Sequence, residues 1–155
     1  MAATAPHVIL INTNGAERPV LSDRVVTATT LPGSIVEVSS AGKLTKISTA
    51  VKQNNQIFVL ENPYATDDTA TALSQTYAAD DEARYIYAQP GDVVYAILAA
   101  SQTVAIGDPL VTTTTAGALG KGTIDATVVD GAIVGYADEA VTTTGATGMI
   151  KVRIA

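Results

Sequence analysis

Apolar and polar residues alternate over short stretches of this chain, and turns containing glycine, proline or asparagine separate the stretches. The clearest alternation covers residues 149–154, where Ile150, Val152 and Ile154 share one face of a strand and Lys151 and Arg153 share the other. This pattern predicts an antiparallel strand with one buried face and one face that meets water or a partner.

Other strands are predicted where β-branched apolar residues gather between turn signals. Residues 35–38 and 44–47 are expected to form a hairpin around Ala41-Gly42. Two Gly-Asp turns, at Gly91-Asp92 and Gly107-Asp108, precede further apolar runs, and such turns reverse a chain because glycine accepts positive φ and the aspartate bonds back to nearby amides. The remaining predicted strands cover residues 57–60, 85–87, 93–98, 109–111 and 133–137.

The β pattern lapses in the acidic segment near residues 62–84. Residues 68–77 fit either a short helix capped by Asp67 or Asp68 or a surface loop. Residues 117–123 resemble a phosphate-binding loop only superficially, because position 122 is Gly where Ser or Thr should follow the lysine. We interpret them as a flexible turn that joins two strands.

The N-terminal segment allows two interpretations. Residues 1–6 are small and residues 8–11 are apolar, so residues 1–15 are either an arm that adds as a strand to a neighbouring molecule or the first internal strand of the fold. Residues 16–155 then form a β-rich domain with the acidic insertion near residues 62–84. The residues expected to contact a partner are His7, Val8, Ile9, Leu10, Ile11, Lys151 and Arg153.

Composition narrows the possible functions. The chain has 155 residues, no cysteine and a net charge of −6, so we expect one domain without disulfides or cysteine-bound metal and without a nucleic-acid partner. No apolar run approaches the roughly 20 residues that span a bilayer, and no signal peptide is recognised. Only 15% of the residues are charged, which favours either burial in an assembly or simply a threonine-rich β protein.

Candidate chemistry is sparse. The carboxylates Asp67-Asp68 and Asp80-Asp81-Glu82 lack the spacing of a calcium loop, and the single histidine, His7, has no triad partners in sight. We therefore expect no catalytic residue, cofactor or metal. The tyrosines at 85, 87, 95 and 136 serve either as core or as interface anchors.

Eight phrases, taken in order, give the chain a family resemblance. They are residues 31–36 (LPGSIV), 41–44 (AGKL), 57–61 (IFVLE), 89–94 (QPGDVV), 106–110 (IGDPL), 116–119 (AGAL), 133–140 (IVGYADEA) and 150–154 (IKVRI). In this order the chain resembles the head decoration, or cement, proteins of tailed bacteriophages, over roughly residues 31–154. It departs from that pattern in residues 62–84, which are longer and more acidic.

The resemblance implies a virion protein without catalytic activity. Such a protein binds the outer face of the capsid and cements neighbouring major capsid protein subunits against internal DNA pressure. Its partners would be that capsid protein and copies of itself, as a trimer or else a dimer, with no direct contact to nucleic acid or membrane. The alternative from the residues is a β-barrel carbohydrate-binding or adhesion module, and a hydrolase built on paired carboxylates ranks third.

The fold class expected from these patterns is mostly β. We predict a single compact β-barrel or β-sandwich-like domain with a flexible N-terminal arm and at most one short helix, and the family resemblance implies that it is β-tulip-like.

Overall fold

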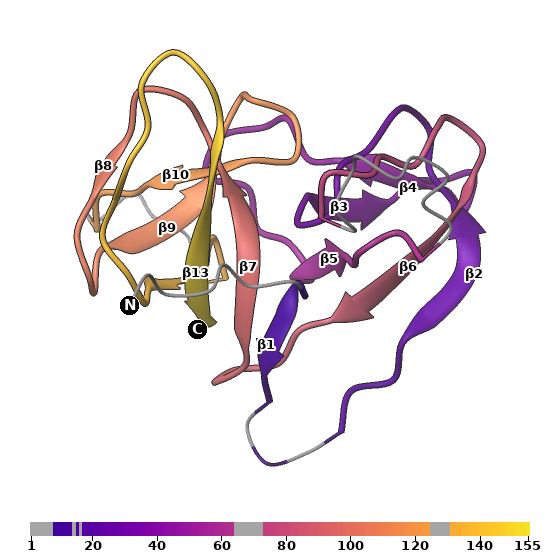
Figure 1. Ribbon diagram of the computed structural model, residues 1–155, viewed down its shortest axis with the longest axis horizontal. Coiled ribbons are helices and arrows are strands. Elements are labelled where there is room, and N and C mark those ends of the chain that lie inside the picture. The colour runs from indigo at the N-terminus through magenta and orange to yellow at the C-terminus, as the bar shows by residue number, and fades with distance from the viewer. Residues whose placement is uncertain (1–7, 14, 16, 64–72, 125–130) are drawn as a thin grey trace.

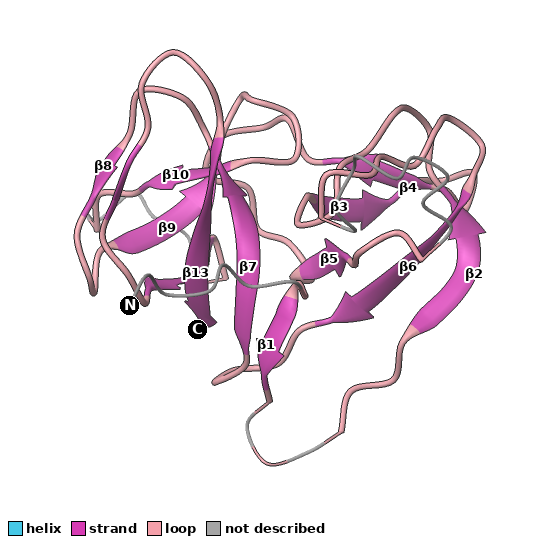
Figure 2. Cartoon of the chain, viewed as in Figure 1, coloured by secondary structure: helices cyan, strands magenta, loops and turns pink. Residues whose placement is uncertain are grey.

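The computed structural model describes residues 8–13, 15, 17–63, 73–124 and 131–155. Within these residues the chain forms strands and turns and no helix (Figure 2). The strands are β1 (Leu10–Asn12), β2 (Leu21–Val25), β3 (Ile35–Val38), β4 (Leu44–Lys46), β5 (Ile57–Val59), β6 (Glu82–Tyr87), β7 (Val93–Leu98), β8 (Thr103–Val104), β9 (Pro109–Thr112), β10 (Leu119–Lys121), β11 (Ile133–Ala137), β12 (Val141–Thr142) and β13 (Gly148–Ile154).

Five strands close into a barrel in the order β7-β10-β9-β11-β13, because β13 also pairs with β7 (Figure 1). The β7–β13 ladder is the longest of the barrel and runs antiparallel from the pair Gly148–Leu98 to the pair Arg153–Val93. On its other edge β7 meets β10 at Leu98 and β1 at Val93 and Val94. A closed barrel leaves few unpaired strand edges, which protects it from unwanted pairing.

A second sheet has the order β2-β6-β5-β3-β4 and lies beside the barrel (Figure 1). Its two outer strands approach each other, since Val26, just after β2, forms a parallel bridge with Leu44 of β4. Both faces of β5 are buried. Ile35, Phe58 and Ile86 on one face share a hydrophobic cluster with the barrel interior, and Val36, Ile57 and Tyr85 contribute to a second cluster. A strand buried on both faces reads as a continuous apolar run, as residues 57–60 do.

Two glycines bring the backbones of the sheet and the barrel together. Gly33 donates its N–H to the Val59 carbonyl of β5 at 2.8 Å and accepts the Ile97 N–H of β7 at 3.2 Å. A Cβ on Gly33 would lie 2.8 Å from the Tyr95 carbonyl oxygen, and its φ of +85° is one that side chains rarely adopt. Gly117 acts similarly, because it accepts from Ile35 and donates to Ile47.

A buried ion pair fixes the segment between β1 and β2 to the barrel. The Arg18 guanidinium contacts the Asp92 carboxylate through two hydrogen bonds, of 2.7 and 3.0 Å, and the Asp92 side chain is fully buried. The same carboxylate accepts the N–H of Gln89 at 2.9 Å. The Asp92 backbone carbonyl accepts the N–H of Ile154, so this turn also holds the last strand.

The predicted fold class is confirmed, since the chain is all-β in the described residues and contains a closed barrel. The predicted hairpin forms, with Val38 opposite Leu44, and the last strand buries Ile150, Val152 and Ile154 as its alternation predicts. Residues 73–77 are not helical. The rest of the predicted segment, residues 68–72, and both proposed caps, Asp67 and Asp68, lie outside the described residues. The interpretation of residues 117–123 as only a turn is wrong, because Leu119–Lys121 is a barrel strand, β10.

Replacing Asp92 by Ala is expected to lower the free energy of unfolding by about 3–5 kcal/mol, because the Arg18 charge then stays buried without this carboxylate. The matched control is Asp138→Ala, which breaks the exposed Arg153–Asp138 pair and should cost less than about 1 kcal/mol. Urea unfolding measures both variants. Equal losses in the two would contradict a structural role for the buried pair.

Val51→Gly is expected to raise the free energy of unfolding by about 1 kcal/mol. Val51 is β-branched yet has φ of +53°, and glycine relieves the strain at some cost in chain entropy. Val20→Gly is the control, because Val20 is similarly exposed and is absent from the residues with positive φ. It should lose stability in the same denaturant titration. A loss for Val51→Gly as large as that for Val20→Gly would refute the strain.

Candidate functional surfaces

The N-terminal contact residues divide between surface and core. His7 lies outside the described residues. Val8 and Ile11 are exposed and Leu10 is half-buried, whereas Ile9 is fully buried in the main core, where its carbonyl accepts the N–H of Tyr95. In this chain, therefore, β1 pairs with β7 of the same molecule, and among the described residues 8–11 it is Val8 and Ile11 that offer substantial apolar surface to a partner.

Lys151 and Arg153 lie on the outward face of β13. The Arg153 guanidinium donates to the Asp138 carboxylate at 3.0 Å, and the two side chains are 57% and 35% exposed. The backbone N–H of Lys151 donates to the Glu139 carboxylate at 2.9 Å. Tyr136 sits opposite Arg153 in the β11–β13 ladder and is 39% exposed. The outward face of this strand therefore combines one locally paired cation with an aromatic ring.

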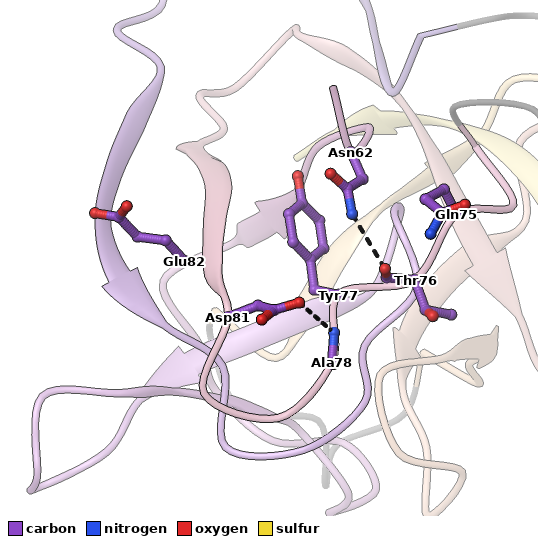
Figure 3. Close-up of a pocket in the computed structure, with 7 residues that line it drawn as sticks. All are labelled: Asn62, Gln75, Thr76, Tyr77, Ala78, Asp81 and Glu82. Carbon is purple, nitrogen blue, oxygen red and sulfur yellow. Dashed lines mark hydrogen bonds between the residues drawn. The ribbon is translucent and has the colours of Figure 1, made fainter. Parts of the chain in front are cut away.

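The carboxylates of Asp80 and Asp81 stabilise their own loop. Asp80 pairs with Lys43 at 2.6 Å, and Asp81 accepts the N–H of Ala78 at 2.9 Å. A hollow of about 470 Å³ lies here, lined by Asn62, Gln75, Thr76, Tyr77, Ala78, Asp81 and Glu82. Figure 3 shows Asn62 donating to the Thr76 carbonyl and Asp81 turned to Ala78.

Two carboxylate residues, Asp81 and Glu82, line this hollow. No group of three or more metal-ligating side chains occurs in the described part of the chain. Asp67 and Asp68, the other candidate pair, lie outside the described residues. Asp80 and Asp81 are bonded to Lys43 and Ala78, so these two carboxylates support the loop.

Among the described residues, Ile106 is the most exposed of the large apolar side chains, at 72%, on the turn between β8 and β9. Asp108 holds this turn, since its carboxylate accepts the N–H of Ala105 at 2.8 Å and pairs with Lys121 of β10 at 2.8 Å. The hydrogen bond from Lys121 keeps the pKa of Asp108 below its usual value. The Gly107 N–H donates to the Ala137 carbonyl of β11. Ile106 is thus an apolar side chain on an anchored turn.

Two further apolar residues follow Ile106, one along the chain and one across the ladder between β9 and β11. Pro109 begins β9 and pairs in register with Tyr136 of β11. We call Ile106, Pro109 and Tyr136 the barrel-end patch. Sequence reasoning missed Ile106 as a surface residue, although its place directly before Gly107-Asp108 was a usable signal, because residues at the tip of a tight turn tend to face solvent.

A second hollow, of about 510 Å³, opens beside the end of β6. Its walls are Arg18, Pro19, Leu21, Tyr87, Gln89 and Pro90, and we call it the β6-edge hollow.

The tyrosines divide between the two roles that the sequence left open, core and surface. Tyr85 is buried, with its hydroxyl on Asp23, and burial together with that bond raises its pKa to about 12. Tyr87 and Tyr136 are surface residues.

Comparisons with known proteins give the chain no family. No protein-family model matches it, and no curated protein matches it either. In the described residues, no helix has the length and apolar character needed to cross a membrane.

Calcium at millimolar concentration is expected to leave the thermal unfolding of the protein unchanged at the loop of residues 80–82. The reason is that Asp80 and Asp81 are already bonded to Lys43 and Ala78. Differential scanning calorimetry with calcium, and with magnesium as the control, measures this. An increase in Tm with calcium that disappears in Asp81→Asn would show that the loop binds the ion.

Proposed function

We propose that this protein is a structural protein of a phage virion, which binds the outer surface of the capsid and cements neighbouring major capsid protein subunits against internal DNA pressure. The ordered sequence phrases support this role. Each phrase includes part of a strand or a turn next to one in the barrel or in the sheet beside it, as residues 89–94 do at the start of β7 and residues 106–110 do before β9.

The observation that carries the proposal is the barrel-end patch. Ile106 is held out from a closed barrel on a turn that Asp108 and Gly107 anchor. Burying an aliphatic side chain of this size contributes about 1.5–3 kcal/mol, and little of that is lost to ordering because the turn is already fixed. A modest contact of this kind suits a protein that binds in many copies.

The charges next to the patch support an apolar contact. Lys121 pairs with Asp108, and Arg153 pairs with Asp138. Since both of these cations have a nearby anion, association through the patch is expected to depend mainly on burial. Copies of the chain in the virion are proposed to form a trimer, with a dimer as the alternative, because closed symmetry satisfies every interface.

Ile106→Glu is expected to weaken binding to capsids at least tenfold, because a carboxylate replaces the apolar side chain that the contact buries. Co-sedimentation with mature, DNA-filled capsids of the cognate phage measures the affinity, and unexpanded procapsids show whether lattice expansion creates the binding site. The matched control is Ala28→Glu, an exposed residue on the loop after β2, which should bind normally.

The outcomes separate the proposal from its competitor. Saturable binding of the wild-type protein that Ile106→Glu loses supports the cement role and the patch. Binding that both variants retain keeps the role but rejects the patch. No binding of the wild-type protein to either form of the capsid contradicts the cement role, and a glycan array then tests the carbohydrate-binding alternative.

A further inference from the structure

The ladder between β2 and β6 stops one step before the end of β6. Its last pair is Leu21 with Tyr85. The next pair along an antiparallel ladder would join Tyr87 to Pro19, but proline has no N–H to donate. The chain before Leu21 instead diverges from β6. In Figure 1 the segment that leads into β2 runs away from the end of β6. β6 therefore extends past Leu21, the first residue of β2.

The backbone groups of Tyr87 point toward the missing partner. On its other side β6 pairs with β5, where Ala88 donates to the Gln56 carbonyl and Leu60 donates to the Arg84 carbonyl. Even-numbered residues of β6 thus bond to β5, and odd-numbered ones face β2, since the groups alternate along a strand. Among the described residues, no hydrogen bond reaches the N–H or C=O of Tyr87.

Tyr87 is one of the residues that line the β6-edge hollow. Leu21, Pro19, Pro90 and the 38% exposed ring of Tyr87 supply mainly apolar walls. Asp92 holds two of the lining residues in place, because its buried carboxylate accepts hydrogen bonds from the Arg18 guanidinium and from the N–H of Gln89. The hollow is therefore formed before any ligand arrives, with Arg18 already committed to Asp92.

We propose that the β6-edge hollow binds an extended, uncharged peptide segment of another protein, which adds to the edge of β6 at Tyr87. An antiparallel segment fits, because a single residue of it can satisfy both the N–H and the C=O of Tyr87. Its side chain on the hollow side is aliphatic or proline, matching the apolar walls. The proposal stands on this geometry and does not need the capsid.

A second copy of this chain, docking through the same surface, does not fit. A two-fold contact would bring two identical hollows together, and two concave surfaces do not fill each other. A slender extended segment can enter the hollow and reach the backbone of Tyr87. We take the occupant to be an extended stretch of another protein, which would belong to the capsid protein if the proposed function holds.

A random-peptide display selection on the immobilised full-length protein tests the inference. Selected peptides should be uncharged at their centre, and their affinity should fall at least tenfold for Gln89→Trp, which fills the hollow. Gln75→Trp is the matched control, because Gln75 lines the other hollow, and it should bind the peptides normally. Peptides with a methylated backbone nitrogen at the central residue should also lose binding.

Amide hydrogen exchange gives a readout that a general loss of folding would not mimic. In the free protein the Tyr87 amide should exchange fast while the Ala88 amide, bonded to Gln56, is protected, and a selected peptide should slow exchange at Tyr87. A protected Tyr87 in the free protein, or a selection without peptides sensitive to Gln89→Trp, would overturn the inference. Capsid binding without peptide binding would reject this site and keep the cement role. Peptide binding without capsid binding would keep this site and reject the cement role.

Discussion

The close approach of the backbone at Gly33 to β7 is the constraint on which the arrangement of the two sheets depends. Gly33 bonds to β5 on one side and to β7 on the other, and there is no room for a Cβ between it and the Tyr95 carbonyl. Backbone hydrogen bonds of this kind leave the five-stranded sheet little freedom to slide along the barrel. The apolar layer of Ile35, Phe58 and Ile86 can then share one core with the barrel interior.

One local device recurs in the loops of this frame. An aspartate carboxylate accepts the N–H three residues before it at Asp81, Asp92 and Asp108, from Ala78, Gln89 and Ala105. The device stabilises a turn wherever it stands, and a cation adds to it at two of the three, Arg18 in the buried case and Lys121 at the surface. Among the acidic residues considered as candidate chemistry in the sequence, Asp81 is thus a turn-forming group.

The sequence predicted those elements whose signal is local. β13 was predicted by its alternation, and the β3–β4 hairpin by Ala41-Gly42, because one face of each strand is buried against the core. β2 escaped prediction because its residues, Leu21–Val25, are mixed in polarity at an outer edge, and β10 because its middle residue is glycine packed beneath Thr113. The order of the strands in the two sheets could not be predicted from the sequence either. Whether Tyr87 faces β5 or an open edge depends on which strands pair, and pairing links residues far apart in sequence.

The barrel-end patch and the β6-edge hollow belong to the same rigid structure, so both can contribute to one interaction. A stable interface buries about 800 Å² on each partner, and three patch residues fall well short of that. Neither surface can therefore hold a large partner by itself. A frame that presents both, together with the exposed Val8 and Ile11 near β1, can engage an extended segment at one place and an apolar face at another. Linked contacts multiply each other's affinity when their geometry is preset, and the backbone bonds at Gly33 and Gly117 preset it here.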